Sequence, residues 1–289
     1  MPHSRFFVYL GANLLTIQNI YLSLKANWRS FWVIRANISR KNYLILAFIG
    51  LVLPIALWWL LSISGLVEKV FMPSPLDVVK RSLNWFSDES LMGDIWISSY
   101  RVFAGFLLSA ILAIPLGVLI GTYQPMKAMF EPLMDFIRYM PAVAFIPLVM
   151  LWVGIEESSK IAIIFIGTFF QMVLMVAEDI RRVPINQIEA AHTMGANSGE
   201  IVSLVIIQSA KPALLDTLRV TMGWAWTYLV VAELVAANSG LGYSILRAQR
   251  FMQTDKIFAG IIFIGLIGLA IDQLFRLLHR KSFPWLYLS

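Results

Sequence analysis

One stretch of the sequence places a single acidic side chain beside two of the smallest residues. Glu189 is followed by Ala190 and Ala191, and Pro184 and Gly195 are suited to begin and to end a short helix around them. Such a short helix buries little surface against its own chain. Its bare alanine surface and its carboxylate instead predict docking into a groove of another protein, where a basic group meets the acid.

The residue types needed for covalent or metal chemistry are scarce in this sequence. Cysteine is absent, which excludes disulfides, Cys-ligated zinc, iron–sulfur clusters and thiol nucleophiles. His3, His192 and His279 are too far apart in the sequence to indicate a metal site. No Gly-x-x-x-x-Gly-Lys-Ser/Thr phosphate loop occurs. We therefore expect no catalytic residue, no metal and no bound cofactor in this chain.

The composition is that of a membrane protein. Of 289 residues, 59% are hydrophobic and 14% are charged, whereas a soluble domain has about 25% charged residues. The formal net charge is +6, but basic residues that flank membrane spans explain such an excess. We expect a lipid bilayer as the surroundings and no nucleic acid as a partner.

Apolar runs predict an all-α polytopic membrane protein. A helix needs about 20 residues to cross the hydrocarbon, and the clearest candidate is the charge-free segment 43–65. A second run ends in Gly117 and Gly121, a spacing that lets helix backbones approach closely. The six predicted crossings lie at 43–65, 102–121, 139–155, 161–177, 220–232 and 257–271.

The charge distribution predicts the orientation of these helices. Residues 1–42 hold six Lys or Arg and no acidic residue, and basic residues also follow the last apolar run, so both termini are expected in the cytoplasm. We divide the chain into a cytoplasmic segment 1–42, a first helix 43–65, a core 66–280 and a tail 281–289. Segment 1–42 is expected to hold an amphipathic helix lying on the membrane; the alternative is a seventh crossing there. The insertion 178–218 is expected in the cytoplasm, and its length indicates a structure and purpose of its own.

Several residues within the apolar runs are candidates for a wet path through the membrane. Two prolines, at 141 and 147, leave carbonyl groups unpaired and are typical of a helix that bends beside a water-filled cavity. The alternatives are a packing kink for the prolines and interhelical hydrogen bonds for the polar groups. The candidate pathway residues are Met140, Pro141, Phe145, Gln171, Trp224 and Thr227.

Charged residues near the predicted span ends are interpreted as structural. Arg101, Arg138 and Arg219 carry the charge to attract an anion, yet interfacial ion pairs or headgroup contacts are the favoured roles. Glu233 is expected to pair with Arg247 or Arg250 and to hold the outer part of the molecule together.

The sequence resembles one known family of membrane proteins. Glu189-Ala190-Ala191, Gly195 and the following Val205-Ile206-Ile207-Gln208 are similar in type and spacing to the cytoplasmic loop of ABC importer permeases. The Leu-Pro that usually ends this pattern is replaced here by Ile207-Gln208. The branch that imports nitrate, sulfonates, taurine and bicarbonate is the most similar, through segments 73–75, 99–106, 115–121, 141–154 and 240–242.

The resemblance implies the type I ABC importer fold, with about six transmembrane helices and a cytoplasmic coupling helix that contains Glu189, Ala190, Ala191 and Gly195. It also implies a second permease copy, two ATPase subunits that use ATP and Mg, an external solute-binding protein and a place in the bacterial inner membrane. Nitrate is the expected substrate, or nitrite; bicarbonate, taurine and alkanesulfonates are the alternatives.

Two other classes remain open at this stage. A secondary transporter would be favoured by charged pairs buried in mid-membrane and by inverted repeats, and the sequence shows neither. A membrane enzyme would need a cluster of His, Asp or Glu at one membrane face, and no such cluster is apparent.

Overall fold

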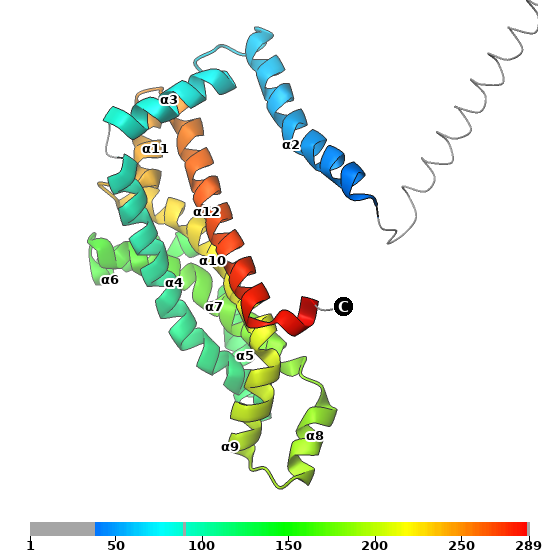
Figure 1. The fold of residues 1–289 in the computed structure, drawn as a ribbon. Coiled ribbons are helices and arrows are strands. Elements are labelled where there is room, and N and C mark those ends of the chain that lie inside the picture. The colour runs from blue at the N-terminus through cyan, green and yellow to red at the C-terminus, as the bar shows by residue number, and fades with distance from the viewer. Residues whose placement is uncertain (1–37, 89–90, 288–289) are drawn as a thin grey trace, which may run out of the picture. The chain divides into compact units, whose positions relative to one another are not determined.

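The computed structural model describes residues 38–287 except 89–90, and every regular element within these residues is a helix (Figure 1). The chain divides into two compact units, 1–64 and 65–289, which are described separately below. Most of segment 1–42, and with it the predicted amphipathic helix, lies outside the described residues. The helices are α2 (Arg40–Ile63), α3 (Pro75–Asp88), α4 (Leu91–Thr122), α5 (Gln124–Arg138), η1 (Ala142–Phe145), α6 (Ile146–Val153), α7 (Glu157–Arg181), α8 (Ile185–Thr193), α9 (Ser198–Glu200), η2 (Ile201–Ile206), α10 (Ile207–Ala236), α11 (Leu241–Arg250), α12 (Thr254–Ser282) and η3 (Pro284–Tyr287).

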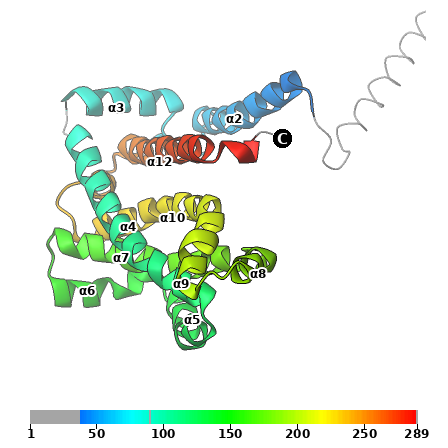
Figure 2. The same ribbon diagram turned by 60° about the horizontal axis from the view of Figure 1, so that its bottom comes forward.

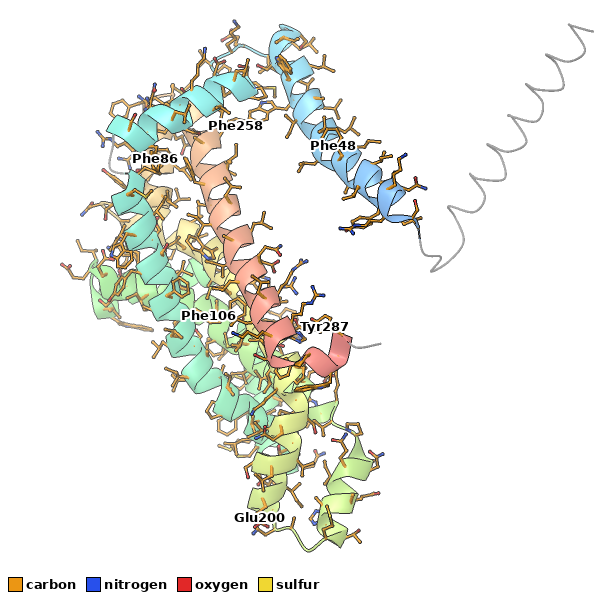
Figure 3. All side chains as sticks on the ribbon, in the orientation of Figure 1. Phe48, Phe86, Phe106, Glu200, Phe258 and Tyr287 are labelled. Atoms are coloured by element: carbon orange, nitrogen blue, oxygen red, sulfur yellow. The ribbon has the colours of Figure 1, made fainter. Side chains whose placement is uncertain are left out.

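The first unit contributes one helix long enough to cross a bilayer. Ser39 caps α2 by accepting a hydrogen bond from the Asn42 amide, and the 24 residues that follow begin three positions before the predicted crossing. Its apolar side chains are exposed, among them Phe48 (Figure 3). Because apolar side chains in water are unfavourable, this surface is suited to lipid or to another membrane helix.

The second unit is a bundle built on four long apolar helices. Spans of 32, 25, 37 and 29 residues lie at Leu91–Thr122, Glu157–Arg181, Ser198–Leu234 and Thr254–Ser282. Helices α4, α7 and α10 pack together, and α12 packs on α10 (Figures 1 and 2). One end of this unit carries α8 and α9, and is called the α8 end; the other carries α3 and α11, and is called the α11 end (Figure 1).

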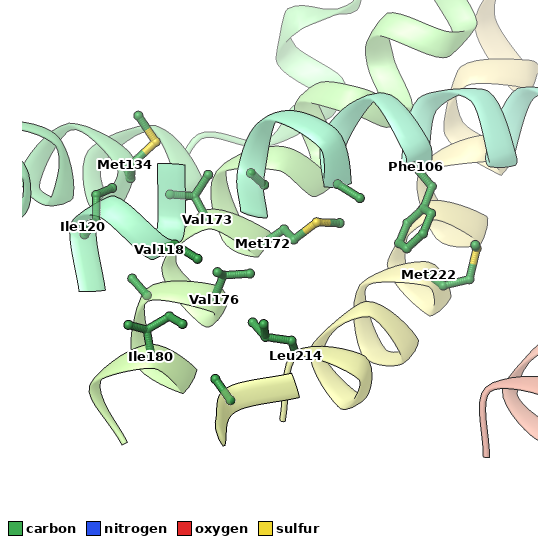
Figure 4. Close-up of a cluster of buried hydrophobic side chains, with 14 of the residues drawn as sticks. Phe106, Val118, Ile120, Met134, Met172, Val173, Val176, Ile180, Leu214 and Met222 are labelled. Carbon is green, nitrogen blue, oxygen red and sulfur yellow. The ribbon is translucent and has the colours of Figure 1, made fainter. Parts of the chain in front are cut away.

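Glycines allow α4 and α7 to approach closely. A Cβ atom on Gly117 would lie 2.6 Å from the Val176 side chain, and one on Gly121 would lie 2.7 Å from the carbonyl oxygen of Ala177. The predicted packing role of this glycine pair is therefore confirmed. The core beside them contains Val118, Val176 and Leu214 from α4, α7 and α10 (Figure 4).

We expect Gly117→Val to lower the free energy of unfolding by about 1–3 kcal/mol, because overpacking forces two backbones apart. Chemical unfolding of the purified protein in detergent measures this change. The matched control is Gly265→Val on α12, where a Cβ atom would meet no heavy atom within 4 Å. Equal stability of the two variants would contradict the close contact of α4 and α7.

The predicted crossing at 139–155 is wrong as a single straight helix. Residues 142–153 form η1 and α6, and α5, which ends at Arg138 just before the predicted crossing, lies at 90° to this pair. Pro141 caps η1, Pro147 lies in the first turn of α6, and Gly154 ends α6 with a φ of +85°. Proline cannot donate a helical hydrogen bond, so two prolines six residues apart favour a broken element over a continuous one.

Much of the predicted insertion 178–218 is helix rather than loop. Helix α7 continues to Arg181, and a second helical stretch begins at Ser198 behind a capping box formed by Asn197 and Glu200. It runs through the π-helical turn η2 directly into α10. Because Asn197 begins this helix well before Gln208, the start of the helix does not depend on the Leu-Pro that Ile207-Gln208 replaces.

Helix α3 begins at Pro75, and proline is well suited to the first turn of a helix because its missing N–H is not needed there. Ser74 donates its hydroxyl to Asp77 over 2.7 Å, and this bond together with the Ser74 amide lowers the pKa of Asp77 from its ordinary value.

Candidate functional site

Helix α8 is the short helix that the sequence predicts around Glu189. Pro184 precedes its first residue, Ile185, and Gly195 follows its end with a φ of +84°. The Gly195 amide donates to the His192 carbonyl and the Ala196 amide donates to the Ala191 carbonyl, over 2.9 and 3.1 Å. These two bonds form a Schellman cap, which satisfies the last carbonyls of a helix that has little else to hold it.

One side of α8 is open to a partner. Glu189 and Ala190 are exposed, and Ala191 is 3% exposed against the rest of the unit. Ile185 and Met194, at the two ends of α8, are 65% and 81% exposed. Within the described part of the chain, no cation lies within ion-pair distance of the Glu189 carboxylate. The structure thus presents an unpaired acid and two large apolar side chains on one short helix.

Helix α8 is connected to the long helix that begins at Ser198. It packs against η2, and the Ser209 hydroxyl donates to the Gln187 side chain over 2.7 Å. A cavity of about 430 Å³ lies between α8 and the ends of α4 and α7, bordered by Ile188, His192 and Ile201 among others. Helix α8 is therefore in direct contact with the long helix that contains η2 and α10.

Four of the six predicted pathway residues border one cavity. This cavity of about 290 Å³ is lined by Met140, Gln171, Trp224 and Thr227, together with residues such as Arg138 and Tyr228. The end of α5 and the start of η1 form one wall, and α7 and α10 form the others. The structure brings these residues together, and their role in translocation remains a prediction.

The other two predicted pathway residues lie beside this cavity rather than on its lining. Pro141 begins η1, and Phe145 packs against a small separate core that contains Ile146 and Ile163. Thr168, also polar and within the apolar run of α7, is fully buried and shares a 2.7 Å hydrogen bond with Ser109 of α4. For Thr168 the interhelical alternative is correct.

A buried ionic network at the α11 end was missed by the sequence analysis. Arg101 is 0% exposed and donates from Nη1 to Glu233 of α10 over 2.6 Å. Its Nε and Nη2 atoms donate to the two oxygens of Glu157 over 2.6 and 2.7 Å. The predicted pairing of Glu233 with Arg247 or Arg250 is therefore wrong, because Arg101 satisfies Glu233 from the neighbouring helix. The ion pair expected for Arg101 is present, and the side chain is fully buried rather than placed against headgroups.

This network fixes the start of α11. The Gly242 amide donates to Glu233 over 2.7 Å, and the Gly240 amide donates to Asp94 over 2.9 Å. A Cβ atom on Gly240 would lie 2.3 Å from a Glu233 oxygen, so this position with its φ of +111° requires glycine. Carboxylates placed at a helix start are favoured by its free N–H groups and its dipole. One signal was available, since Asp94, Ser98 and Arg101 recur at helical spacing directly before the apolar run 102–121.

With this geometry established, comparison with known proteins identifies the family. Residues 113–283, more than half of the chain, match the model of the binding-protein-dependent transport system inner membrane component. The chain belongs to this family. It is therefore a permease subunit of ABC importers, a class of membrane subunits that are not themselves enzymes.

Relatives of the permease agree with this assignment. It is 37% identical to a probable ABC transporter permease protein of Brucella melitensis biotype 1, over 79% of this chain and 92% of the relative. It is 37% identical to the putative aliphatic sulfonates transport permease protein SsuC of Bacillus subtilis (82% and 87% covered), and 30% identical to the taurine transport system permease protein TauC of Escherichia coli K12 (80% and 86%). The branch predicted from the sequence is thereby confirmed at the level of sulfonate and taurine permeases.

A solved structure shows the same fold. The permease is similar to a chain of the inward-facing MetNI methionine ABC transporter, with a TM-score of 0.55 at 22% identity, over 64% of this chain and 94% of that chain. The predicted type I importer architecture is confirmed.

Proposed function

We propose that this permease carries a small anion across the inner membrane, with an organosulfonate as the leading substrate class. The main support for ATPase-driven transport is the exposed helix α8 with its unpaired Glu189, because this helix offers a binding surface for an ATPase subunit. The substrate class follows from the relatives named for aliphatic sulfonates and taurine. Nitrate, ranked first from the sequence, becomes an alternative because the relatives named above are permeases for sulfonates and taurine. Nitrite and bicarbonate are further alternatives, since they are also small oxyanions.

The proposed assembly contains several subunits. Two copies of this permease form one pathway, two ATPase subunits bind ATP and Mg, and an external solute-binding protein delivers the anion. Each ATPase binds α8, and a basic groove on the ATPase contacts the Glu189 carboxylate. Closure of the ATPase dimer pushes α8, and the contact of α8 with η2 turns this push into a movement of α10.

This assignment sets the orientation of the bundle. The α8 end faces the cytoplasm, where ATP is available, and the α11 end faces outward. In this proposal the chain crosses six times, with α5–η1–α6 counted as one broken span, and both termini lie in the cytoplasm; the basic residues at both ends support this orientation.

We expect selectivity among anions to reside chiefly in the solute-binding protein. Vesicles that contain the permease and its ATPases should import taurine when supplied with a taurine-binding protein. Exchange for a nitrate-binding homologue that docks on the same permease should change the imported anion. Uptake of labelled taurine, nitrate and bicarbonate measures this. Unchanged selectivity after the exchange would place the filter within the membrane subunit.

A further inference from the structure

The cavity between α5, α7 and α10 has a charge of one sign on its lining. Arg138 borders it, and none of the described residues that line it is an Asp or Glu. Gln171, Trp224, Thr227 and Tyr228 add side chains with hydrogen-bond donors. The Thr227 hydroxyl donates over a long 3.4 Å to the Gly223 carbonyl and can rotate toward a ligand. A cavity of this kind attracts anions, because a cation on a low-dielectric wall concentrates ions of opposite charge.

The guanidinium of Arg138 keeps N–H donors that can bind a ligand. Its Nε donates to Asp135 over 2.9 Å and its Nη2 donates to the Tyr139 hydroxyl over 3.2 Å. Asp135 is not part of the cavity lining. A guanidinium has five N–H donors, and these two bonds leave Nη1 without a protein partner within the described ranges. Asp135 and Tyr139 thus hold the guanidinium in place and leave donors for an anion.

The cavity is accessible along α10. Thr227 and Gly223, one helical turn apart, are both exposed, and a Cβ atom on Gly223 would meet no heavy atom within 4 Å. The cavity volume of about 290 Å³ is several times the volume that one molecule occupies in liquid water, which is about 30 Å³. A small organic anion can therefore enter with part of its hydration.

The remaining wall is aromatic and depends on a glycine. Tyr228 lies against Gly167 of α7, where a Cβ atom would be 2.4 Å from the ring. This close approach keeps the ring against α7 and leaves the cavity open. Phe170, Trp224 and Tyr228 supply apolar surface that suits the short alkyl part of an organic anion rather than a bare inorganic ion.

We propose that this cavity is a binding site within the membrane for small organosulfonates, in which Arg138 binds the sulfonate group and Gln171 and Thr227 add hydrogen bonds. Trp224 and Tyr228 contact the alkyl part. The ligand class rests on the proposed function, whereas the preference for anions rests on the lining of the cavity alone. The site is a second point of selection, after the solute-binding protein.

The absence of cysteine from the sequence permits a direct test. Thr227→Cys in the full chain, in membranes with its partner subunits, is treated with 2-sulfonatoethyl methanethiosulfonate or with its trimethylammonium analogue. Ser87→Cys, exposed on α3 and bonded only within its own helix, corrects for the intrinsic rates of the two reagents. Labelling of this chain is followed by mass.

We expect the anionic reagent to modify Thr227→Cys about tenfold faster than the cationic one after this correction, the lower limit for a charged cleft. Adding Arg138→Gln should remove the difference, and millimolar ethanesulfonate should slow labelling only when Arg138 is present. Arg276→Gln, which removes a cation paired with Asp272 on α12, should leave the ratio unchanged.

Three results would overturn the site: equal corrected rates for both reagents, a ratio that survives Arg138→Gln, or no labelling of Thr227→Cys. Protection by nitrate but not by ethanesulfonate would overturn the ligand class while leaving the anion preference. None of these readouts requires ATP-driven import. A charge-selective cavity in a chain that associates with no ATPase would therefore refute the proposed function and leave the site intact.

Discussion

Glu189→Lys is expected to reduce ATP-driven uptake by on the order of a hundredfold, while the protein still inserts and folds. A lysine at position 189 would face a basic group in the ATPase groove, and this repulsion weakens the binding free energy of permease and ATPase by several kcal/mol. Each 1.4 kcal/mol lowers the affinity for the ATPase tenfold. Glu189 is exposed and pairs with no cation in the described residues, so its replacement removes no contact that stabilises the bundle. Uptake of labelled substrate by reconstituted vesicles measures the effect.

Two further variants separate docking from a general effect of charge. Glu189→Gln removes the charge without reversing it, and we expect an intermediate loss. Glu68→Lys makes the same charge change at an exposed position beside the start of α3, and the ATPase should still co-purify with it. Normal uptake by Glu189→Lys would refute the role of α8 in docking, and equal loss of the ATPase from Glu68→Lys would show that the effect is not local.

Arg101→Met is expected to lower the free energy of unfolding by about 3–5 kcal/mol, the cost typical of a buried charge left without its partner. Arg101 and Glu233 are both fully buried, and Glu233 also accepts from the Ser98 hydroxyl over 2.8 Å. Removing the cation leaves the Glu233 carboxylate next to apolar helices. Chemical unfolding in detergent, with proteolysis of the 237–240 segment as a local readout, measures the loss.

A double-mutant cycle tests whether the pair itself is responsible. In Arg101→Met combined with Glu233→Gln, no buried charge is stranded, so the double variant should be more stable than Arg101→Met alone. Glu157→Gln should cost much less, because the Glu157 side chain is 44% exposed and water can replace its partner. A loss under 1 kcal/mol for Arg101→Met would contradict the structural role of this network.

The features that were predicted correctly are those encoded in neighbouring residues. Helix α2 follows from a charge-free run between charged ends, and α8 follows from Pro184 and Gly195 on either side of Glu189. Gly117 and Gly121 indicate a close contact without naming the partner, which is α7. Each of these signals needs only local geometry.

The features that were missed depend on which helices become neighbours. The prolines at 141 and 147 indicated a bend, but hydropathy carries no information on direction, so the 90° angle between α5 and the pair η1 and α6 was not apparent. Glu233 has several arginines near it in sequence, yet its partner is 132 positions away on α4. A polar stripe on α4 was visible, but the helix that faces it is a property of the packed bundle. The substrate is not encoded in any single motif of this chain.

The most direct test of the central claim, that α8 couples this permease to an ATPase, is purification of the tagged chain from its native membranes in mild detergent, with identification of every stoichiometric partner by mass. We expect an ATPase subunit in a ratio of one to each permease chain, and loss of that subunit in Glu189→Lys. A chain that purifies without an ATPase, under conditions that preserve other ABC complexes, would contradict the account.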